Sequence, residues 1–96
     1  MRLNKKQISS IKNLALKLFN SNDVYLFGSR VDDTLKGGDI DLYIQTRKKE
    51  DILMSKIVFL REFEKEFGEQ KVDLIVDNGS IKKKIFDIAI ENGVKL

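Results

Sequence analysis

The spacing of apolar side chains along the chain predicts three amphipathic helices. Residues 4–20 and 50–67 both place apolar groups three and four positions apart, which is the repeat of one helical face. A third helix is predicted to follow a cap at Ser80 and to end before Gly93. Each helix has an apolar side that must be buried against another element.

Three shorter segments predict β-strands. Residues 24–27 form an apolar run that Gly28 ends, and residues 39–45 and 72–76 alternate between apolar and polar side chains. The predicted order is therefore α-β-β-α-β-α. We expect one α+β domain over residues 1–96, with a small mixed sheet and the helices on its apolar face.

The composition removes several kinds of chemistry. The chain has no Cys and no His, so disulfides, ordinary zinc sites, Ser-His-Asp catalysis and Cys-His catalysis are excluded. Carboxylates, hydroxyls, Lys and Arg remain, together with hard cations that bind oxygen. An enzyme built from carboxylates would therefore use Mg²⁺ or Mn²⁺.

Charge and hydropathy indicate which partners and which cellular location to expect. The net charge of +3 comes from 18 basic and 15 acidic residues, an excess that permits nucleic-acid binding without indicating it. No apolar run exceeds four residues, so neither a membrane span nor a signal-peptide core is expected. We expect a cytoplasmic protein without a membrane partner, and the sequence leaves open whether it forms a homo-oligomer.

The second predicted strand carries the chemistry. Asp39 and Asp41 are two residues apart, so their carboxylates project from one face with Cα atoms about 6.5–7 Å apart. If the third strand pairs beside the second, Asp73 comes within about 5 Å on the same face. Three such carboxylates repel one another, and two Mg²⁺ ions about 3.5–4 Å apart would remove the repulsion. The alternative is a solvated strand face that has no catalytic role.

The residues before this strand support the interpretation of the carboxylates as a catalytic site. Gly28 directly follows the first strand, where its backbone can approach a phosphate closely, and Ser29 adds a hydroxyl. Residues 26–44 resemble the signature of the DNA polymerase β-like nucleotidyltransferase superfamily; they have the sequence L-F-G-S-R-V-D-D-T-L-K-G-G-D-I-D-L-Y-I. The small size of the whole chain points to the minimal nucleotidyltransferase branch of that superfamily. The family's third carboxylate lies between apolar residues on a later strand, which Asp73 matches.

The resemblance implies a set of roles. Gly28 and Ser29 would bind the triphosphate of an NTP, most simply ATP, and Arg30 would either join them or be an exposed turn residue. Asp39 and Asp41 would hold two Mg²⁺ ions, with Mn²⁺ as a substitute, and Asp73 would complete the site and help to activate the attacking hydroxyl. The reaction would transfer a nucleoside monophosphate and release pyrophosphate.

Three hypotheses for the biological role remain. Small members that resemble this chain are typically the antitoxin of a toxin-antitoxin pair whose partner is a helical HEPN protein, and some add AMP to that partner. A second hypothesis is a binding module that neutralises a partner by contact alone. A third hypothesis is an enzyme that modifies a small hydroxyl compound such as an aminoglycoside. This third hypothesis is less favoured because no acceptor-binding domain is evident.

Overall fold

A computed structural model describes residues 3–28 and 39–96. Within them, the chain forms three helices and four strands, in the order α1 (Lys5–Phe19), β1 (Asp23–Phe27), β2 (Ile40–Gln45), α2 (Ile52–Phe67), β3 (Val72–Asp77), α3 (Lys84–Asn92) and β4 (Val94–Lys95). The first helix begins with a capping box in which the side chains of Asn4 and Gln7 each accept a hydrogen bond from the other residue's backbone N–H. The α+β class is confirmed.

The four strands form one mixed sheet in the order β3-β2-β1-β4. The pairing of β1 with β2 and with β4 is antiparallel, whereas β2 and β3 run parallel, with α2 as the crossover between them. Because β2 and β3 are parallel, their first residues lie at the same end of the sheet. This end is also where β1 finishes, at Phe27 opposite Asp41.

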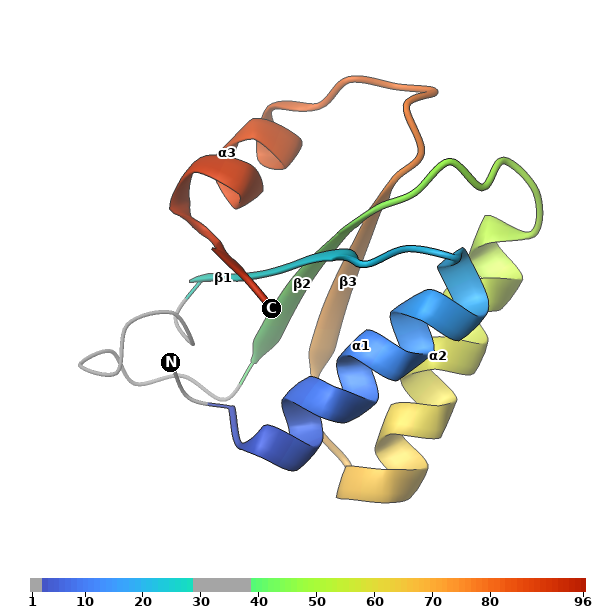
Figure 1. The fold of residues 1–96 in the computed structure, drawn as a ribbon, viewed down its shortest axis with the longest axis vertical. Coiled ribbons are helices and arrows are strands. Elements are labelled where there is room, and N and C mark those ends of the chain that lie inside the picture. The colour runs from blue at the N-terminus through green and yellow to red at the C-terminus, as the bar shows by residue number, and fades with distance from the viewer. Residues whose placement is uncertain (1–2, 29–38) are drawn as a thin grey trace.

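One face of the sheet, called here the first face, is entirely apolar. Figure 1 shows α1 and α2 lying together against it. Alternate residues of β1 and β2 point into this core, which also includes Leu74 of β3 and side chains of both helices; its fully buried members are Ile11, Ala15, Phe19, Val24, Leu26, Ile40, Leu42, Ile44, Phe59 and Phe63. The rings of Phe19 and Phe59 join the two helices, with centroids 6.4 Å apart.

The opposite face, called the second face, is covered in part by α3. Phe86 and Ala89 of this helix form a separate buried cluster with Tyr43 of β2, and the two aromatic rings have centroids 5.6 Å apart. The expectation that all helices lie on one face was therefore wrong for α3. The physical reason is that the second face also carries apolar side chains, Tyr25, Phe27 and Ile75 among them, and these too must be buried.

One predicted boundary and one further element near the C-terminal end also differ from the prediction. The third helix begins at Lys84 rather than at Ser80, whose backbone N–H donates to the side chain of Asn78 in a turn. Helix formation through Lys82 and Lys83 would place more positive charge at the positive end of the helix dipole, which is unfavourable. The short strand β4 was not predicted. It follows Gly93, where any Cβ would overlap the backbone carbonyl oxygen of Ala89.

In the part of the chain that the structure describes, none of the helices is both long enough and apolar enough to span a membrane.

Candidate active site

The parallel pairing of β2 and β3 brings two of the predicted acidic residues together. Asp41 is the second residue of β2, Asp73 is the second residue of β3, and they are direct partners in the register. Both side chains point to the second face, beyond the part that α3 covers, because they alternate with core residues such as Leu42 and Leu74. Asp41 is half-buried and Asp73 is exposed.

Asp39 lies one residue before β2 and faces the same side. Its carboxylate Oδ2 is 3.6 Å from Nζ of Lys71, which lies one residue before β3. The backbone supports this arrangement, since the N–H of Ile40 donates to the carbonyl oxygen of Lys71 at 3.0 Å. The structure therefore places all three predicted carboxylates at one end of the sheet, with one ammonium group beside them.

Burial and neighbouring charges shift the pKa of Asp41. Burial raises its pKa above the ordinary value of 3.8, and the negative charge of Asp73 raises it further. A side-chain hydrogen bond with Asp73 and the charge of Asp39 act in the same direction, whereas the charge of Lys71 lowers the pKa. Asp41 is thus at the centre of an acidic group that favours either a proton or a bound cation.

Gly28 packs directly against this acidic group. Its φ of +79° lies in the left-handed region that favours glycine. A Cβ at this position would overlap the Oδ2 atom of Asp41 and would lie 3.1 Å from its Cγ atom. The backbone conformation therefore favours glycine, and any larger residue would displace the Asp41 carboxylate. Ser29 and Arg30, the other two predicted phosphate ligands, lie outside the described residues.

The donor set fits a hard divalent cation, because carboxylate oxygens are the ligands that Mg²⁺ and Mn²⁺ prefer. Asp41 and Asp73 are close enough to share a hydrogen bond, but Asp39 is paired with Lys71. Among residues 3–28 and 39–96, no group of three potential ligands is already gathered as a metal site.

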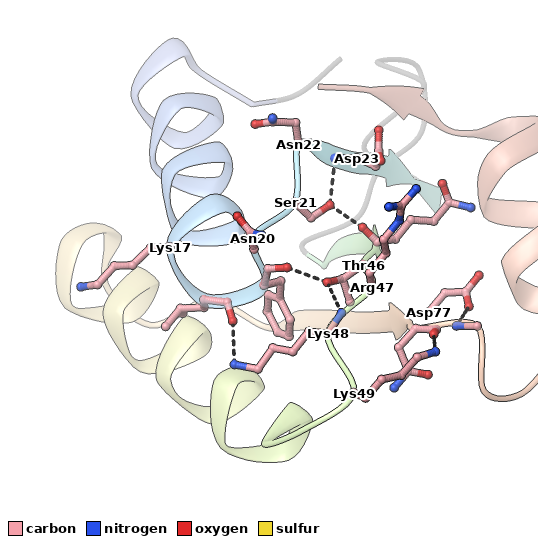
Figure 2. Close-up of a pocket in the computed structure, with 15 residues that line it drawn as sticks. Lys17, Asn20, Ser21, Asn22, Asp23, Thr46, Arg47, Lys48, Lys49 and Asp77 are labelled. Carbon is pink, nitrogen blue, oxygen red and sulfur yellow. Dashed lines mark hydrogen bonds between the residues drawn. The ribbon is translucent and has the colours of Figure 1, made fainter.

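A large open cavity lies at the other end of the sheet. It has a volume of about 1150 Å³ and is lined by residues where β1 begins and where β2 and β3 end (Figure 2). Two of its lysines connect neighbouring segments: Lys48 donates to the carbonyl oxygen of Leu18 and to the hydroxyl of Ser55, and Lys49 donates to the carbonyl oxygen of Asn78. We assign these two lysines a structural role, and the cavity is separate from the acidic group.

Comparison with known protein families agrees with the geometry at the acidic end. The family model described as "Polymerase beta, Nucleotidyltransferase" matches residues 9–96. This chain belongs to the polymerase beta nucleotidyltransferase family. A search of curated proteins gave no significant match. The family implies an NTP substrate and transfer of a nucleoside monophosphate, and its members generally use divalent metal ions.

Two residues of this nucleotidyltransferase domain were missed by sequence reasoning. Lys71 is two positions before Asp73, so the same alternation that grouped the carboxylates could have placed its ammonium beside Asp39. Tyr43 shares the face of Asp41 but is fully buried, and its hydroxyl donates to Oδ2 of Asp77 at 2.5 Å. Burial and this hydrogen bond raise the pKa of Tyr43, so its hydroxyl stays protonated and acts as a donor.

Proposed function

We propose that this protein transfers AMP from ATP to a hydroxyl group with the help of two Mg²⁺ ions. The observation that carries the proposal is the register of β2 and β3, which sets Asp41 beside Asp73 with Asp39 next to them and Gly28 packed against Asp41. Mn²⁺ would substitute for Mg²⁺ because its ligand preferences are similar.

Each residue has a distinct task in this reaction. Asp39 and Asp41 would hold the cations, and Asp73 would complete the ligand set and accept the proton of the attacking hydroxyl. Gly28 leaves room for the backbone to approach the triphosphate, with Ser29 and Arg30 as its further ligands. When bound, the metal ions neutralise charge on the phosphates. The hydroxyl oxygen forms a bond to the α-phosphorus, and the bond from that phosphorus to the β-phosphate oxygen breaks, which releases pyrophosphate.

We further propose that the acceptor is a HEPN-type partner protein and that this chain is its antitoxin. The resemblance of residues 26–44 to the minimal nucleotidyltransferases supports this assignment. An apolar group on α2 supports a protein partner as well: Leu53, Met54 and Ile57 are 71%, 60% and 41% exposed, which is unusual for a helix that also covers a core. This group lies on the face of the sheet opposite to the carboxylates, so it supports a partner of this chain and does not itself place a hydroxyl group at the acidic end.

The test uses ATP labelled at the α-phosphate and, separately, at the γ-phosphate. Each is incubated with Mg²⁺, the purified protein and a lysate of its source, with Asp41→Asn as the comparison. We expect label to move only from the α-phosphate, and the variant to lose at least about a hundredfold in rate, more than the loss typical of an outer-shell partner of a metal ligand. The labelled product then identifies the acceptor.

The same assay separates catalysis from neutralisation by contact. A partner that co-purifies with both proteins, is inactivated equally by both and receives no label would contradict the proposed reaction and favour a contact-only module. Transfer from the γ-phosphate would instead indicate a kinase reaction. Circular dichroism of Asp41→Asn shows whether its fold is intact, so loss of folding is not mistaken for loss of chemistry.

A further inference from the structure

Four charged side chains form a two-by-two group where β2 and β3 begin. Asp41 pairs with Asp73 in the parallel register, and two residues earlier Asp39 lies beside Lys71 in the same way. Residues two apart on a strand share a face, so all four side chains project from the second face. The group holds three negative charges and one positive charge.

Lys71 is the only cation found in an ion pair with these three carboxylates among residues 3–28 and 39–96. Its ammonium is 3.6 Å from the Asp39 carboxylate, and its charge also acts on Asp41, whose pKa it lowers. Lys71 therefore supplies part of the positive charge that this acidic group requires.

A divalent cation and the ammonium group of Lys71 would compete for the carboxylate of Asp39. A metal ion that uses Asp39 needs its oxygen lone pairs, and a nearby ammonium both occupies the carboxylate and repels the cation. The ion pair is exposed, with side chains 70% and 46% accessible, so water screens it and it can be broken at small cost.

We infer that Lys71 is a positioning residue that competes with the metal ion for Asp39 and thereby sets the metal concentration at which the site fills. This inference rests on the proposed function, because it takes Asp39, Asp41 and Asp73 as the metal ligands. In the metal-free protein, Lys71 keeps Asp39 apart from the Asp41–Asp73 pair. Release of Asp39 from Lys71 completes the group of three carboxylates.

The test is a Mn²⁺ titration of the metal-free protein at low ionic strength, followed by the electron paramagnetic resonance signal of free Mn²⁺. We expect Lys71→Met to lower the Mn²⁺ concentration at half-saturation by about two- to fivefold, the range that corresponds to an exposed ion pair. Lys71→Arg keeps the charge and should stay close to the wild-type value.

Lys65→Met is the matched control. Lys65 is also 70% exposed and has an ion pair of similar length, 3.8 Å to Glu62, on α2, which covers the opposite face of the sheet. It should leave Mn²⁺ binding unchanged. In an Asp39→Asn background, Lys71→Met should have a smaller effect, because only the direct repulsion between the ammonium and the cation is left to remove. In the wild-type background its effect should shrink at high salt, where the ion pair is screened.

Three results would overturn the inference: Mn²⁺ binding that is equal or weaker in Lys71→Met, an equal gain in Lys65→Met, or a gain in the Asp39→Asn background as large as that in the wild type. The proposed function fails separately if wild-type protein binds Mn²⁺ but transfers no label from α-labelled ATP. If the wild-type protein does not bind Mn²⁺ at all, both are wrong.

Discussion

The two faces of the sheet differ in their side chains and in the helices that cover them. The first face is apolar along its whole length and is buried under α1 and α2. The second face is divided: α3 covers its aromatic part around Tyr43, whereas its other end carries Asp39, Asp41 and Asp73. The first face therefore supplies most of the apolar burial that stabilises the fold, and the second combines a smaller core with like charges that oppose folding in the absence of a cation.

The largest expected effect comes from removing one phenylalanine ring from each face. Phe59→Ala, on α2, should lower the free energy of unfolding by about 3–5 kcal/mol, because the ring is fully buried in the larger core. Phe86→Ala, on α3, should cost less than about 3 kcal/mol, since its cluster is smaller and the ring is 8% exposed. Urea denaturation of both variants measures the difference. The reverse order would show that the second face is the main core.

The next effect sharpens the role of Gly28 at the acidic end. Gly28→Ala should destabilise the protein by about 1–2 kcal/mol because of its positive φ, and should weaken Mn²⁺ binding about tenfold, because the new methyl group displaces the Asp41 carboxylate. Gly79→Ala is the control: its φ is +81°, but the nearest atom to a Cβ is Nζ of Lys49 at 3.6 Å. It should show a similar loss of stability with unchanged Mn²⁺ binding. Equal weakening in both variants would contradict a specific role for Gly28.

The smallest effect concerns the repulsion among the carboxylates. Because the pKa of Asp41 is raised in the folded protein, ionisation of this group destabilises the metal-free fold as the pH rises through that pKa. Asp41→Asn should therefore stabilise the metal-free protein at neutral pH, by less than about 1 kcal/mol since solvent screens a half-buried group. The gain should disappear in acid, where Asp41 is protonated in both the folded and the unfolded state.

Asp39→Asn provides the contrast for that measurement. Asp39 already has Lys71 as a partner, so its neutralisation should not stabilise the metal-free protein. Thermal unfolding of both variants between acidic and neutral pH, without metal, measures the difference. A gain in Asp39→Asn as large as that in Asp41→Asn would mean that the ion pair with Lys71 does not offset the repulsion.

The sequence was sufficient to predict the features that depend on a simple repeat. Strict alternation over residues 39–45 predicted the facing of Asp39 and Asp41, and the helical repeats predicted α1 and α2 to within two residues at each end. The position of Asp73 beside Asp41 was predicted on the condition that the third strand pairs with the second, and the structure confirms this pairing. Its parallel direction was not predicted. The predicted features are local or follow from one crossover connection.

The features that were not predicted depend on tertiary contacts. The position of α3 depends on the aromatic side chains of the second face, whose burial cannot be read from alternation alone. Strand β4 is only two residues long, too short for any repeat to be visible. The pairing of Lys71 with Asp39 joins residues 32 positions apart: alternation places Lys71 on the face of Asp73, and the strand register then sets it beside Asp39.

Strand β4 covers the backbone edge of β1 that would otherwise be open to other chains. Its residues pair with β1, Lys95 with Tyr25 and Val94 with Leu26, and the N–H of Leu96 donates to the carbonyl oxygen of Val24. Without these few residues, β1 would become an outer strand with free backbone donors and acceptors, which is the usual template for aggregation. A segment too short to contribute much to folding energy thus protects the strand that leads directly to Gly28.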